Sequence, residues 1–136
     1  MTPRQVKLGR KKEPRKALLR NLVISLILHE KIKTTLPKAK ALKMRMERLV
    51  EWAKRGDLVG KRRLGKELYF GPAVLKMTKV LGPQYKNRIG GYLRVIRLGH
   101  RLGDGAVMAQ VEFVESKPEA KEKEKVEEAK ETAKKR

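Results

Sequence analysis

The chain has 136 residues, of which 36 are Lys or Arg and 15 are Asp or Glu, giving a net charge of +21. This length suits one domain with a modest core, and so large a charge calls for a polyanionic partner, because self-repulsion destabilises a compact chain. Without cysteine there can be no disulfide, cysteine zinc site or thiol catalysis.

Nucleic acid is the partner that this charge favours most, since neutralised phosphates release counterions. An anionic membrane surface is the alternative partner that this charge allows. No apolar run approaches the ~18 residues that span a bilayer. The basic N-terminus is not followed by the apolar segment of a secretory signal, so we expect a cytoplasmic protein without a membrane partner.

Residues 1–13 form a basic arm with almost no apolar content. Such a segment cannot bury enough surface to offset the entropy lost on ordering. We therefore expect the arm to be disordered alone and to order along phosphates.

Residues 14–30 predict a first helix, with Pro14 in the first helical position. Leu18, Leu22 and Leu26 recur at every fourth residue, so we expect this helix to be the central piece of the core. The β-branched residues of the following segment, KIKTTL, predict a short strand.

A second helix is predicted over residues 37–55, where Pro37 can open it and Gly56 can close it. Its apolar residues form a 3–4 spaced stripe: Ala39, Leu42, Met46, Leu49 and Ala53. Its cations lie opposite and beside that stripe: Lys40, Lys43, Arg45, Lys54 and Arg55. Such a helix can pack on a core while it faces an anion.

Two further helices are predicted before the last strands. Asp57 can cap the third, although Gly60 and Gly65 lower its helix propensity. The fourth covers residues 71–83 and is expected to end at Gly82.

The chain then predicts a hairpin of two strands, near residues 91–98 and 106–114, with Asp104-Gly105 as its turn. We expect Leu93 and Val95 to face the helices. The expected outward residues are Tyr92, Arg94, His100 and Arg101. The alternation slips at Ile96 and Arg97, which leaves open whether a bulge lies there.

Residues 115–136 differ in composition from the rest, with eight Lys or Arg and seven Glu at low complexity. We expect a disordered or transiently helical tail of net charge +1, which leaves +20 on residues 1–114. The predicted organisation is thus an arm (1–13), one α+β domain (14–114) and a tail (115–136).

Catalytic motifs are incomplete. The segment from Gly60 to Lys66 fits most of a phosphate-binding loop, but Glu67 stands where a hydroxyl should bind Mg²⁺, and no apolar strand precedes it. His29 and His100 have no metal-site spacing. Since no titratable groups converge on a recognisable pocket, we predict no enzyme, cofactor, metal or small-molecule substrate.

The composition favours RNA over DNA. Two Asn and three Gln are a poor set for reading base edges, and no helix-turn-helix spacing is visible. Lys and Arg with scattered Gly suit backbone contacts to a shaped RNA. A DNA-coating architectural protein is the alternative, and a phosphate-loop enzyme is a remote third. The Lys- and Glu-rich, Asn- and Gln-poor balance is also typical of thermophile proteins.

The segment HEKIKTTLPKAKALKMRMERLV, residues 29–50, resembles the signature region of the bacterial large-subunit ribosomal protein number seventeen family. The segments ALLRNL and RIGGYLRVIRLGHRLGDGAVMAQVEFV resemble it too, so the likeness covers residues 4–114. Thr2-Pro3-Arg4 replaces the family's Met-Arg-His start, and Leu93 replaces a common Thr. The matching signature residues are Ile32, Thr34, Thr35, Lys38, Ala39, Lys40, Glu47, Leu49 and Val50.

The resemblance implies a two-layer α+β fold of helix, strand, three helices and two strands. It also implies binding to large-subunit (23S) ribosomal RNA, protein neighbours near the tunnel-exit side, and no catalysis. The residues predicted to bind RNA are Arg4, Lys7, Arg10, Lys11, Lys12, Arg15, Arg20, Lys33, Lys38, Lys40, Lys43, Arg88, Tyr92, Arg94, Arg97, His100 and Arg101.

Overall fold

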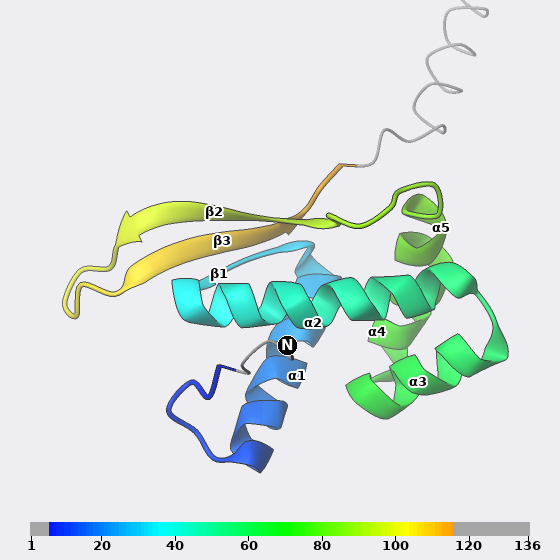
Figure 1. Cartoon of the computed structure of the whole chain (residues 1–136), viewed down its shortest axis with the longest axis horizontal. Coiled ribbons are helices and arrows are strands. Elements are labelled where there is room, and N and C mark those ends of the chain that lie inside the picture. Colours follow the sequence, from blue (N-terminus) through cyan, green and yellow to red (C-terminus); the bar gives the residue numbers. More distant parts are fainter. Residues whose placement is uncertain (1–5, 116–136) are drawn as a thin grey trace, which may run out of the picture.

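The computed structural model describes residues 6–115, in which helices pack on one face of a small sheet (Figure 1). The predicted α+β fold is confirmed, with α4, η1 and α5 together forming the fourth helix. Arg4, and all of the predicted tail except Glu115, lie outside the described residues. The elements are α1 (Lys12–His29), β1 (Lys31–Thr35), α2 (Leu36–Arg55), α3 (Leu58–Leu68), α4 (Gly71–Lys76), η1 (Met77–Leu81), α5 (Gly82–Gln84), β2 (Leu93–His100) and β3 (Val107–Phe113).

Helix α2 is the centre of the core. The whole predicted stripe of α2 is buried, together with Val50. Helix α1, which we expected in this place, buries only Val23, Leu26 and Ile27. The reason is position: α2 contacts the sheet on one side and the other helices on the other, whereas α1 meets the core near its C-terminal end (Figure 1). None of the helices in residues 6–115 has the length and apolar content of a membrane span.

The predicted ends of α2 and the cap of α3 are confirmed. Pro37 lies in the first turn of α2, and Gly56 ends it with a left-handed φ of 66°. The Asp57 side chain accepts a hydrogen bond of 2.7 Å from the backbone N–H of Gly60. Helix α1, however, begins at Lys12, before Pro14. Proline is tolerated there because the first N–H groups of a helix have no partner within the helix.

The fourth helix was predicted to end at Gly82, and this prediction is wrong. Its N–H donates to the carbonyl of Met77, five residues back, in a π-helical turn, and the helix continues to Gln84. Pro83 has no N–H to offer the preceding turn, which favours such a widened turn. A Cβ on Gly82 would lie 2.6 Å from the carbonyl oxygen of Ala53, so this glycine lets the fourth helix approach α2 closely.

The sheet has the strand order β1-β3-β2, and both pairs are antiparallel. Ala109 and Val111 of the central strand are fully buried on the face toward the helices, together with Leu93 of β2. Val95 is half-buried against the same core, as predicted. The opposite face of the sheet has no helix over it in the described chain (Figure 1).

The irregularity in β2 is a β-bulge. The register with β3 shifts between Arg97 and Gly99, which leaves Leu98 as the extra residue. A bulge adds one residue to one strand, so side chains after it exchange faces relative to simple alternation.

Candidate nucleic-acid interface

The first turn of α1 carries several cations at the N-terminal end of the helix, where positive charge is unfavourable. Lys11 is the N-cap residue and makes no side-chain capping bond, and Lys12 and Arg15 follow in the first turn. The positive end of the helix dipole lies here, so these charges repel it in the free protein. Glu13 is the acidic residue of this turn, and within the described chain its ion pair is with Lys16, at 3.8 Å, and not with these three cations. A phosphate at this end would relieve the repulsion.

The approach to α1 is a turn. The N–H of Arg10 donates to the carbonyl of Lys7 at 3.1 Å, and Leu8 and Gly9 both have a positive φ. Lys7, Arg10 and Lys11 are all exposed. The turn therefore presents three of the predicted RNA contacts just ahead of the helix.

The first half of α2 and the neighbouring strand carry four of the predicted lysines. Lys33 and Lys40 are exposed, and Lys38 and Lys43 are half-exposed. Within residues 6–115, none of these four lysines forms an ion pair. Their charges are available to an external anion, while the buried stripe of α2 fixes the backbone beneath them.

The predicted cationic residues of β2 lie on two faces of the sheet, and the bulge determines the face of His100. Arg94 lies on the open face of the sheet, as predicted. Arg97 and His100 lie opposite Ala109 and Val107 of β3, which places both on the face toward α2. We expected His100 beside Arg94, and this grouping is wrong because the bulge shifts the alternation by one residue.

Arg94 has an internal partner. Its Nε lies 3.7 Å from Oε1 of Glu112, whose other oxygen accepts a 2.9 Å hydrogen bond from Gln110. The Arg94 side chain remains 55% exposed, so the pair is a surface one and worth little in stability. An RNA phosphate would compete with Glu112 for this guanidinium.

The hairpin tip is ordered by Arg101 and Asp104. Both carboxylate oxygens of Asp104 accept hydrogen bonds from the Arg101 guanidinium, and Oδ1 also accepts one of 3.2 Å from the N–H of Ala106. These bonds hold the pKa of the Asp104 carboxyl far below its ordinary value. The predicted turn is confirmed. Arg101 shapes the loop, so less of its charge is free for RNA.

His100 contacts the same loop. Its Nδ1 lies 2.9 Å from the carbonyl oxygen of Gly105. A carbonyl can only accept, so Nδ1 is the protonated nitrogen and Nε2 is left toward solvent. His100 is exposed, so its other ring nitrogen is accessible to an external partner.

Tyr92 was predicted to face outward, and this prediction is wrong. Its side chain is 1% exposed, and its ring lies edge-on to Tyr85 with the centroids 5.6 Å apart. The regular strand begins only at Leu93, and Gly90 and Gly91 both have left-handed φ angles that turn the chain just before it. Tyr92 therefore packs into the core.

A polar cluster that sequence reasoning missed surrounds the Tyr92 hydroxyl. The hydroxyl donates to Glu51 and accepts from Nζ of Lys54 at 2.7 Å. Lys54 also donates to the carbonyl of Arg88 at 2.6 Å. Hydrogen bonding to Tyr92 is the main reason that the pKa of Lys54 is raised. The spacing of Glu51 and Lys54 on one helix was the only sequence signal.

Arg20 is occupied inside the molecule. Its Nε donates to the carbonyl of Glu67 at 2.9 Å, and its guanidinium lies 4.5 Å from the centre of the Tyr69 ring. Both contacts link α1 to α3. The predicted RNA contact of Arg20 would have to be made in addition to this bridge.

The segment resembling a phosphate-binding loop is an ordinary helix. The element that leads directly into α3 is helix α2, which ends at Gly56, whereas a phosphate-binding loop follows a strand. The Glu67 carboxylate forms an ion pair with the guanidinium of Arg45 of α2, at a distance of 2.6 Å. A Cβ on Gly60 would lie 2.6 Å from the carbonyl oxygen of Trp52, so this glycine permits helix packing rather than phosphate binding.

Within residues 6–115, the predicted cations that form no ion pair lie before and on α1, on β1, in the first half of α2, and on or just before β2. In Figure 1 the hairpin and the first turn of α2 lie at the left, and the start of α1 lies in the same half of the view.

Residues 18–114 match the family model described as Ribosomal protein L17. The chain belongs to the ribosomal protein L17 family. This family is a structural component of the large ribosomal subunit, so the prediction that the chain is not an enzyme is confirmed, as is the predicted family resemblance.

Curated relatives support the same membership across most of the chain. "Large ribosomal subunit protein bL17" of Cereibacter sphaeroides (strain ATCC 17029) is 50% identical over 115 residues, covering 85% of this chain and 83% of the relative. The proteins of the same name from Roseobacter denitrificans and Paracoccus denitrificans are each 50% identical over 115 residues, covering 85% of this chain and 82% of each relative.

Proposed function

We propose that this L17-family chain binds and stabilises folded 23S ribosomal RNA through phosphate neutralisation and shape recognition. The observation that carries the proposal is the set of lysines at the start of α2 and on β1. They have no ion pair within residues 6–115, and a packed core holds their backbone in place. Fixed cations lose little entropy when they meet phosphates, and each phosphate neutralised releases counterions.

The proposed interface has three parts: the arm with the first turns of α1, the first half of α2 with Lys33, and the β2–β3 hairpin. Cations on separate elements can bridge RNA segments that would otherwise repel each other. The hairpin presents Arg94 on one face and Arg97 with His100 on the other, which suits insertion between two backbones. Such an interface reads the shape of RNA and not its base sequence.

The partners follow from the same proposal. The chain would be incorporated into cytoplasmic ribosomes, with neighbouring large-subunit proteins near the tunnel-exit side. The arm, residues 1–13, would order along phosphates, and its last two residues already belong to α1.

Competition binding tests the proposal against DNA coating. The full chain is bound to a 23S RNA transcript at physiological salt and challenged with duplex DNA or with unlabelled transcript at equal nucleotide concentration. We expect the RNA to compete and the DNA to leave the complex largely intact. Efficient displacement by duplex DNA would support a general DNA-coating protein and overturn the proposal.

A further inference from the structure

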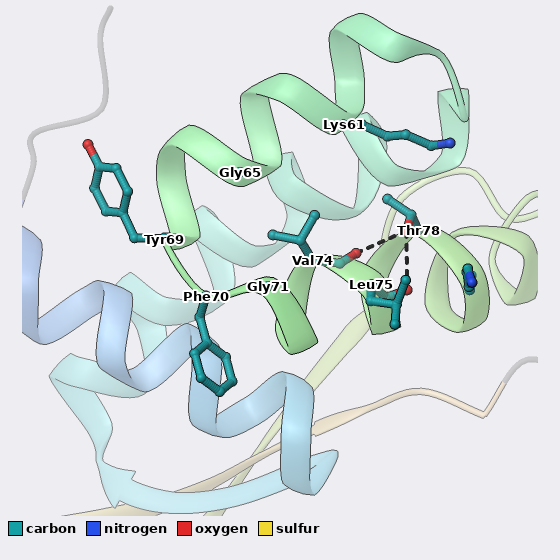
Figure 2. A pocket seen from close by; sticks show the side chains of 9 residues that line it. Lys61, Gly65, Tyr69, Phe70, Gly71, Val74, Leu75 and Thr78 are labelled. Atoms are coloured by element: carbon teal, nitrogen blue, oxygen red, sulfur yellow. Dashed lines mark hydrogen bonds between the residues drawn. The ribbon is translucent and has the colours of Figure 1, made fainter.

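An apolar groove lies between α3 and the fourth helix, outside the proposed interface. Its volume is about 510 Å³, within the range of about 300–1,000 Å³ that ligand sites occupy. Figure 2 shows α3 on one side and Val74, Leu75 and Thr78 on the other. The Thr78 hydroxyl shares its one hydrogen between two carbonyls of its own helix, at 3.0 and 3.1 Å, so the lining stays mostly apolar.

Gly65 keeps the groove open. It lies inside α3 with an ordinary helical φ, and a Cβ added there would meet nothing within 4 Å. Neither backbone conformation nor internal packing therefore requires glycine, although alanine would favour the helix. Gly60 of the same helix differs, because its Cβ would clash with α2. The missing side chain at Gly65 leaves room for something outside this molecule.

Tyr69 ends α3 beside the groove in an unfavourable backbone state. Its φ is 51°, a left-handed conformation that a bulky residue rarely adopts, and its side chain points outward from the end of α3 (Figure 2). The residue is 71% exposed, and Arg20 packs over its ring. The left-handed conformation lets the Tyr69 N–H donate to the carbonyl of Gly65 at the end of α3, and the part of the ring that Arg20 leaves uncovered remains open to a partner outside the chain.

The groove is positively charged at its rim. Lys61 and Lys79 line it, and none of its nine lining residues is acidic. Within residues 6–115 neither lysine forms an ion pair. An apolar floor, a largely exposed aromatic ring at its edge and two cations together match the parts of a nucleotide: a base that stacks and a phosphate.

We propose that this groove receives an unpaired nucleotide of the ribosomal RNA, with its base against the Gly65 floor and the Tyr69 ring and its phosphate between Lys61 and Lys79. The inference rests on the proposed RNA binding and adds a second contact on a different part of the surface. The charge of +20 on residues 1–114 favours RNA over a protein segment as the occupant.

The test uses the full chain and 23S transcripts carrying 4-thiouridine or 6-thioguanosine, irradiated and mapped by mass spectrometry. We expect adducts at Tyr69 or Phe70. Gly65→Leu fills the groove and should abolish these adducts and weaken binding at least about five-fold. Asn21→Leu, which adds the same side chain at an exposed position of α1, should retain both. Gly65→Ala should raise the melting temperature while it weakens the adducts.

The outcomes separate this inference from the proposed function. If the wild type does not bind the transcript, both fail. If it binds but Gly65→Leu matches Asn21→Leu in affinity and adducts, the groove inference is overturned and RNA binding stands. If Gly65→Leu binds naked RNA normally but is lost from subunits reconstituted with all proteins, the occupant is a protein and the inference is again wrong.

Discussion

The Nζ of Lys54 lies 2.6 Å from the carbonyl oxygen of Arg88, and this bond ties α2 to the loop before β2. The same ammonium lies 2.7 Å from the Tyr92 hydroxyl, which donates to Glu51. These polar groups satisfy one another at the edge of the core, so the loop that carries Arg88 is held in one position. A predicted RNA contact thus depends on residues that would not touch RNA.

Replacing Tyr92 by phenylalanine should destabilise the protein. The change leaves Glu51 and Lys54 without their shared partner, and a hydrogen bond to a charged group contributes about 1.5–3 kcal/mol. We expect the free energy of unfolding, measured with urea, to fall by about that amount. Tyr69→Phe is the control, because that ring is exposed and should change little. Equal effects of the two substitutions would refute the role of the cluster.

Stability should fall at alkaline pH through Tyr85. Burial raises the pKa of Tyr85 to about 12 from an ordinary 10, and its hydroxyl donates to the carbonyl of Val114 at 2.6 Å. Between these values the unfolded chain has lost a proton that the folded chain keeps. This contribution is therefore fully present below pH 10 and is lost as the pH rises toward 12.

The comparison with Tyr85→Phe isolates this effect. The variant should show a smaller loss of unfolding free energy than the wild type between pH 10 and 12. Ultraviolet titration of the folded wild type should also show one tyrosine that ionises near the top of this range. Parallel pH profiles for the two proteins would count against the assignment.

Two glycines of α3 should respond in opposite ways to alanine. Gly60→Ala should lower the free energy of unfolding by about 1–3 kcal/mol, since its Cβ would lie 2.6 Å from the carbonyl oxygen of Trp52. Gly65→Ala should raise it by roughly 0.5–1 kcal/mol, the usual gain in helix propensity. Thermal and urea unfolding measure both, and a gain in stability for both would show that the α2–α3 contact at Gly60 is not tight.

Removing residues 116–136 should leave RNA affinity nearly intact. The segment from residue 115 onward carries a net charge of only +1, so few condensed counterions are at stake. Filter binding or fluorescence anisotropy at physiological salt gives the comparison. A loss of ten-fold or more on truncation would mean that the tail makes specific contacts that its composition does not suggest.

Local signals in the sequence predicted much of this fold. Helices α2 and α3 begin or end as expected at Pro37, Gly56 and Asp57. Helix ends can be predicted because capping and backbone freedom depend on residues within a few positions. The long-range features were not accessible. The order β1-β3-β2 requires pairing of strands that lie far apart in the chain, and Gly82 serves a contact with Ala53 of another helix.

The candidate site shows the same division. Cations on α2 and the hairpin could be predicted from charge and periodicity. The burial of Tyr92 could not, because it depends on two glycines that turn the chain and on a partner, Glu51, in another element. The exchange of faces at His100 arose from one extra residue in β2, which alternation alone does not locate.

The central claim is that the lysines of α2 that form no ion pair within residues 6–115 neutralise RNA phosphates, and the salt dependence of binding tests it most directly. Affinity for the 23S transcript is measured from low to high salt for wild type, for Lys38→Gln/Lys40→Gln/Lys43→Gln, and for the charge-matched control Arg48→Gln/Arg55→Gln/Arg62→Gln. We expect the lysine variant to bind more weakly with a slope of log Kd against log salt reduced by roughly 2–3, and the control to stay near wild type. Identical slopes for the lysine variant and the wild type would contradict the account.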